Sequence, residues 1–122
     1  GLAAAHAIHN GLTLLEGTHA FFHGEKVAFG TLAQLVLENA AKEELEEVLA
    51  FCLDVGLPVC LADLGVAELS GEALAAVAQK ACIPGESVHA MPFPVTEAAV
   101  AAAIKAADSL GAAFKKRAGR IA

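Results

Sequence analysis

The segment 42–55 has the clearest helical pattern in the chain. Its apolar positions follow the i, i+3, i+4, i+7 spacing that places side chains on one face of a helix. These positions are Leu45, Val48, Leu49 and Cys52. Glutamates and Asp54 fall on the opposite face, and Gly56 and Pro58 are typical of a helix end. The pattern therefore predicts an amphipathic helix over 42–55.

Four further helices are predicted by the same reasoning. A first runs over about 2–15, interrupted or tightly packed near Gly11, and is followed by a turn at 17–18. A second covers about 24–39 and is apolar nearly all round, as expected of a buried helix. Ser70 and Thr96 are N-cap residues for helices over 71–82 and from 97 to the basic end near Arg117. We expect a single all-α helical bundle over 1–122, with only one turn of helix in the segment 57–67.

Composition supports helices and excludes several classes of function. Alanine accounts for 29 of the 122 residues, and the formal net charge is -6. The acidic balance argues against a nucleic-acid partner, and no apolar run reaches the roughly 20 residues of a membrane span. No secretory signal is visible. The three cysteines are odd in number and far apart in the chain, and none of them forms a Cys-x-x-Cys pair. A cytoplasmic protein with reduced, buried thiols is predicted.

Histidines are concentrated near the start of the chain, which is the main chemical signal. Four of the five lie within eighteen residues: His6, His9, His19 and His23. His6 and His9 share a helix face among alanines, where an imidazole needs a hydrogen-bond partner, a metal or solvent. The residues alone leave two interpretations open, a satisfied core position and a metal site. His19, in a predicted loop, is expected to be solvated.

A metal site would need ligands from both of the first two helices. His23 begins the second helix and could project toward His6, while Glu25 and Lys26 are expected to be first-turn surface charges. Two imidazoles are too few, because catalytic zinc sites usually have three protein ligands and an open position. No aspartate of the chain is obviously placed to be the third.

Three segments carry a resemblance to a known family: 1–13, 23–32 together with 34–37, and 88–94. They resemble the glycerol-oxidising members of the iron-containing alcohol dehydrogenase family, whose fold is related to that of dehydroquinate synthase. The resemblance covers essentially the whole chain. It implies the helical, metal-binding C-terminal domain, with the N-terminal NAD-binding domain absent from this sequence.

The resemblance also implies residue roles. His6 and His23 match the two family histidines that bind the metal, Zn²⁺ or Fe²⁺ in its place, while the family's aspartate ligand lies upstream of this chain. His9 matches a histidine beside the catalytic cleft and is the candidate catalytic residue, in a supporting role. The expected reaction is zinc-assisted hydride transfer from glycerol, or a related diol, to NAD, giving dihydroxyacetone.

Two other expectations accompany this interpretation. The chain by itself is expected to be inactive and to form a homo-oligomer through apolar surface that a partner domain would cover. The alternative is a non-catalytic helical bundle that binds a metal weakly through His6, His9 and His23, or that only self-associates.

Overall fold

The computed structural model describes residues 3–20 and 23–121, and over these residues the fold is all-α, without strands. Five α-helices form most of it: α1 (Ala3–Leu12), α2 (His23–Leu37), α3 (Lys42–Val55), α4 (Gly71–Ala81) and α5 (Glu97–Ile121). Three 3₁₀ helices lie between them: η1 (Glu16–Ala20), η2 (Ala62–Leu64) and η3 (Ser87–Ala90). The predicted all-α fold class is confirmed.

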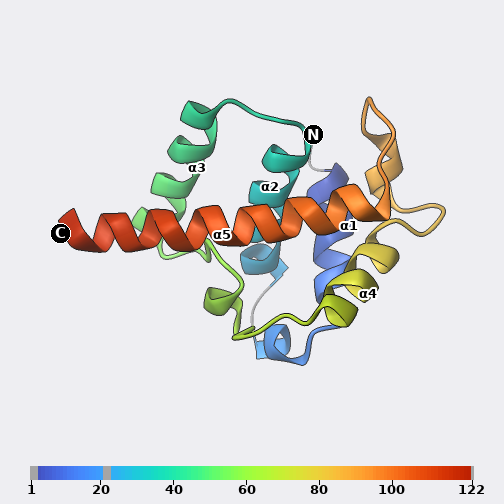
Figure 1. Ribbon diagram of the computed structural model, residues 1–122, viewed down its shortest axis with the longest axis horizontal. Coiled ribbons are helices and arrows are strands. Elements are labelled where there is room, and N and C mark those ends of the chain that lie inside the picture. Colours follow the sequence, from blue (N-terminus) through green and yellow to red (C-terminus); the bar gives the residue numbers. More distant parts are fainter. Residues whose placement is uncertain (1–2, 21–22, 122) are drawn as a thin grey trace.

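Helix α5 is the longest element and lies across the others (Figure 1). It packs against α2 and α4, and its last turns extend beyond the body of the bundle. Helix α1 packs against α2, α4 and η3, so it lies at the centre of the contacts near the start of the chain. None of the described helices is both long and apolar enough to cross a membrane.

Local sequence signals account for several helix ends. The Ser70 hydroxyl accepts a hydrogen bond from the Ala73 amide at 3.1 Å, and Thr96 caps α5 through the Ala99 amide at the same distance. Gly56 ends α3 in the left-handed conformation, with φ of 77°. The bounds predicted for α3 are confirmed, and those for α2 and α4 hold to within two residues.

The first helix is shorter than its pattern predicts. Its predicted start at Leu2 lies outside the described residues, and α1 ends at Leu12 rather than Leu15. The buried Thr18 hydroxyl lies 3.0 Å from the carbonyl oxygen of Leu12, the last residue of this helix, and 2.8 Å from that of Leu15, three residues further on. It can donate its one hydrogen to either of them. The backbone leaves the α-helical pattern here, because the amides of Leu15 and Thr18 bond carbonyl oxygens three residues back. The predicted turn becomes part of η1.

Close contact between α1 and α2 fixes the position of the histidines. A Cβ at Gly30 would lie only 2.7 Å from the Ala5 carbonyl oxygen, so only glycine allows this approach of the two backbones. Nearby, the buried Gln34 side chain accepts a hydrogen bond from the Ala5 amide at 3.0 Å. Since that amide lies in the first turn of α1, Gln34 supplies the partner that the helix itself lacks.

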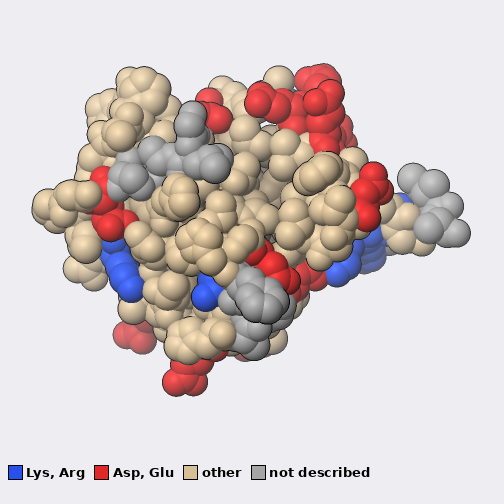
Figure 2. Space-filling model, turned by 180° about the vertical axis from the view of Figure 1, so that it is seen from behind, with Lys and Arg blue, Asp and Glu red and all other residues tan. Residues whose placement is uncertain are grey.

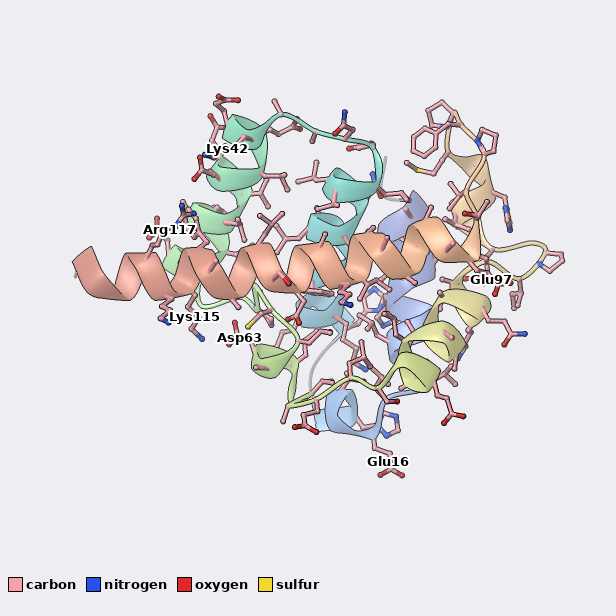
Figure 3. The ribbon with its side chains drawn as sticks, viewed as in Figure 1. Glu16, Lys42, Asp63, Glu97, Lys115 and Arg117 are labelled. Carbon is pink, nitrogen blue, oxygen red and sulfur yellow. The ribbon has the colours of Figure 1, made fainter. Side chains whose placement is uncertain are left out.

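Helix α5 is held to the loop after α3 by charged and polar contacts. Lys115 forms an ion pair with Asp63 at 2.6 Å, below α5 in Figure 3. Asp63 also accepts a hydrogen bond from the Val59 amide at 3.1 Å. Leu110 of α5 is 46% exposed, although it is apolar. The exposed side chain lies on the side of α5 that faces solvent, although the next residue, Gly111, is buried.

These contacts predict a pH-dependent stability. Burial by itself would raise the pKa of Asp63, but the hydrogen bonds from Lys115 and Val59 outweigh it and lower the pKa below the ordinary value of 3.8. The stabilisation is therefore complete above the unfolded-state value and is lost as the pH falls through the lower folded-state pKa. We expect Asp63→Asn to reduce the free energy of unfolding at pH 7 by about 1 kcal/mol, because Lys115 is half exposed.

Urea unfolding at pH 7 and at about pH 2 tests this expectation. The deficit of the Asp63→Asn variant should shrink toward zero in acid. Asp54→Asn, at an exposed position of α3, is the matched control and should show no deficit at either pH. A deficit of the Asp63 variant that is the same at both pH values would contradict the ion-pair explanation.

Candidate functional site

Three imidazoles meet where α1 and the first residue of α2 come together. The rings of His6 and His23 have centroids 5.9 Å apart with an interplanar angle of 30°. His9 is closer to His23, with centroids 4.2 Å apart and the rings edge to face at 70°. His6 and His23 are exposed and His9 is half-buried. The structure therefore brings together all three histidines singled out from the sequence, at a site open to solvent.

A line of polar contacts continues from this site into the protein. His23 Nδ1 lies 3.1 Å from His9 Nε2, and His9 Nδ1 lies 3.3 Å from the Asn10 amide oxygen. Asn10 in turn donates from Nδ2 to the Glu86 carboxylate at 3.0 Å. Glu86 lies just before η3, 76 positions from Asn10 along the chain. No periodicity could have paired these two residues, and no local sequence signal marks either of them as part of a site.

The surroundings of His9 disfavour its charged form. Partial burial lowers the pKa of His9 below 6.5, and the neighbouring charge of His23 lowers it further. The hydrogen bond to Asn10 opposes the shift without cancelling it. His9 is therefore neutral at physiological pH and can offer one nitrogen lone pair.

Lys26 was predicted to be a surface charge, and this prediction was wrong. It is only 8% exposed, although it lies in the first turn of α2. Its charge contributes to the lowered pKa of His9, which places it in the electrostatic field of the histidines. Nothing in the sequence indicated this burial, because a lysine in the first turn of a helix usually faces solvent.

The other histidines lie apart from this cluster. His19 is exposed as predicted, with Nε2 2.8 Å from the Thr13 carbonyl oxygen. His89 Nε2 lies 2.9 Å from the Cys82 carbonyl oxygen. Both rings therefore contact main-chain oxygens rather than other imidazoles.

A complete set of metal ligands is not found in the described part of the chain. Across residues 3–20 and 23–121, no group of three or more His, Cys, Asp or Glu side chains is placed to hold an ion. Both ring nitrogens of His9 already face other side chains, so at most two of the three rings, those of His6 and His23, can each offer a nitrogen to an ion. The donor set fits a divalent ion only if a further ligand joins it.

The cysteines do not contribute ligands to the histidine cluster. All three are free thiols; Cys52 and Cys60 are buried, as predicted, whereas Cys82 is half-buried. Burial raises the pKa of each thiol. These cysteines are consequently protonated at neutral pH and poor nucleophiles.

Comparison with known proteins gives consistent results. The chain is 60% identical over 111 residues to glycerol dehydrogenase of Citrobacter freundii, covering 91% of this chain and 30% of that enzyme. It is 55% identical to glycerol dehydrogenase of Thermotoga maritima, again covering 91% of this chain and 30% of the relative. No family model matches the chain.

Solved structures agree with these sequence matches. A probable glycerol dehydrogenase from Sinorhizobium meliloti superposes with a TM-score of 0.87 at 49% identity, over 91% of this chain and 31% of that one. Glycerol dehydrogenase from Schizosaccharomyces pombe gives a TM-score of 0.91 at 40% identity, over 96% of this chain and 30% of that one. The chain is thus homologous to one part of an oxidoreductase. That part spans about 30% of the length of the glycerol dehydrogenases that it matches.

Proposed function

We propose that this chain is the helical, metal-binding domain of an NAD-dependent glycerol dehydrogenase. The observation that carries the proposal is the meeting of His6 and His23, with ring centroids 5.9 Å apart, in a chain that is 60% identical over 111 residues to a glycerol dehydrogenase. Neutral imidazoles are common ligands of divalent ions. In this proposal His6 and His23 hold Zn²⁺, or Fe²⁺ in its place, and an aspartate outside this chain completes the set.

The residues of the chain would divide the work at this site. Zn²⁺ bound there would act as a Lewis acid on a hydroxyl oxygen of glycerol or a related diol, favouring hydride transfer to NAD. His9 supports the site by fixing the orientation of His23, which it contacts at 3.1 Å. Lys26 places a buried positive charge near the rings, which disfavours protonation of His9.

The remaining parts of the proposal concern assembly and location. We propose that NAD is bound by an N-terminal domain not contained in this sequence, and that the enzyme is cytoplasmic and homo-oligomeric. Several large apolar side chains are exposed: Leu14, Phe51, Val55, Ile83 and Leu110. The face shown in Figure 2 consists mainly of residues other than Lys, Arg, Asp and Glu. In this proposal, association between subunits covers the exposed apolar side chains named above.

The experiment that tests the function is a chimera. The matching 111 residues of the Citrobacter freundii enzyme are replaced by those of this chain. We expect glycerol-dependent reduction of NAD by the chimera, within about tenfold of its parent, and none by the 122-residue chain alone. Turnover by the isolated chain would contradict the division of the active site between two domains. A folded, metal-loaded chimera without activity would contradict the proposed function.

A further inference from the structure

Glu86 is connected to His23 through a continuous line of polar side chains. The contacts run from Glu86 to Asn10 at 3.0 Å, from Asn10 to His9 at 3.3 Å and from His9 to His23 at 3.1 Å. Glu86, Asn10 and His9 are all half-buried, whereas His23 is exposed at the end of the line. The line therefore joins a carboxylate behind the site to an imidazole at its surface.

The carboxylate determines the direction of every hydrogen bond in this line. An ionised carboxylate can only accept, so Asn10 must turn its NH₂ group toward Glu86 and its oxygen toward His9. Because an amide oxygen can also only accept, the hydrogen of neutral His9 lies on Nδ1. His9 Nε2 is then an acceptor, and the hydrogen of His23 must lie on Nδ1. The lone pair of neutral His23 is left on Nε2.

We propose that Glu86 is a positioning residue that holds His23 in the tautomer with a free Nε2, the form able to bind a divalent ion. This inference rests on the proposed metal role of His23. Ligating histidines commonly have their other nitrogen oriented by a hydrogen bond, which fixes tautomer and ring orientation. Here the orienting carboxylate of Glu86 does not contact His23 itself and acts through two intervening side chains, those of Asn10 and His9.

The decisive variant is Glu86→Gln, which keeps the shape of the side chain. A glutamine can present either its oxygen or its NH₂ group to Asn10, so both directions of the line become possible. The exposed Glu68, changed to glutamine, is the matched control. Asn10→Ala interrupts the line at its next member. Backbone amide spectra of each variant show whether the fold is kept.

The first measurement uses the 122-residue chain without metal. Nitrogen NMR of the imidazole rings at about pH 8, where an ordinary imidazole is neutral, distinguishes protonated from unprotonated ring nitrogens. We expect the hydrogen on Nδ1 of both His9 and His23, and a mixture of tautomers in Glu86→Gln and in Asn10→Ala. The Glu68→Gln spectrum should be unchanged. The proposal would be overturned if the hydrogen of His23 lies on Nε2, or if neither Glu86→Gln nor Asn10→Ala changes the tautomers.

The second measurement is Zn²⁺ affinity, by competition with a chromophoric chelator. We expect Glu86→Gln to weaken binding about tenfold, as for other residues that orient a ligand. The double variant with Asn10→Ala should bind as Asn10→Ala alone does, because Glu86 acts only through Asn10. Additive losses would overturn the proposal. If the tautomers respond as expected but the chain and the chimera take up no Zn²⁺, the role of Glu86 in orienting His23 stands and the proposed metal site fails.

Discussion

Replacing His23 by alanine is expected to abolish zinc uptake by the chimeric enzyme, and His6→Ala should do the same. Each substitution removes one of the two imidazoles that the α1–α2 contact places 5.9 Å apart. A zinc site with three protein ligands has no further side chain to replace a lost ligand, since the fourth position is occupied by water or substrate. The affinity for Zn²⁺ should fall by at least about 100-fold. This is the largest loss typical of substitutions at residues that hydrogen-bond to a ligand, and loss of the ligand itself should cost no less. Metal content per subunit after desalting, with glycerol-dependent NAD reduction, measures the effect.

His19→Ala is the matched control for these two substitutions. His19 lies between them in sequence and is exposed, but its ring contacts the Thr13 carbonyl oxygen rather than another imidazole. We expect full metal content and activity in this variant. An equal loss of zinc from His19→Ala would mean that the ligands are wrongly assigned.

The sequence predicts this cluster only in part, for a physical reason. The spacing of His6 and His9 on one helix face is a local property, and it was visible as a pattern. The approach of His23 depends on the α1–α2 contact at Gly30, which joins residues far apart in the chain. Glu86 reaches the same site across 76 positions, and no short-range signal marks such a partner.

The helices follow a similar division between local and distant causes. The ends of α3 and the cap at Ser70 follow from neighbouring residues, and the sequence predicts them. The early end of α1 is accompanied by burial of Thr18, whose hydroxyl contacts the Leu12 carbonyl oxygen, and Lys26 of α2 is buried as well. Both look like ordinary polar positions until the chain is folded. In these two places, prediction from pattern failed at a buried polar side chain.

The largest effect on stability is expected from Gly111→Ala, in the middle of α5. Gly111 is buried, and a Cβ there would lie 2.7 Å from the Val59 carbonyl carbon and closer still to its oxygen. Residues of α5 before and after Gly111 bind the loop that contains Val59. Asp108 accepts a hydrogen bond from the Leu61 amide at 2.8 Å, and Lys115 forms an ion pair with Asp63. The loop therefore cannot move away from a new Cβ without breaking these two contacts.

We therefore expect Gly111→Ala to reduce the free energy of unfolding by about 3 kcal/mol, as for severe overpacking of a core, and Tm by about 10 °C. Gly119→Ala is the control in the same helix, since a Cβ there meets nothing within 4 Å. It should be neutral or stabilising by up to about 1 kcal/mol, because alanine favours a helix over glycine. Thermal and urea unfolding compare the two. Equal stability of both variants would show that α5 can move away from Val59, contrary to the close contact described above.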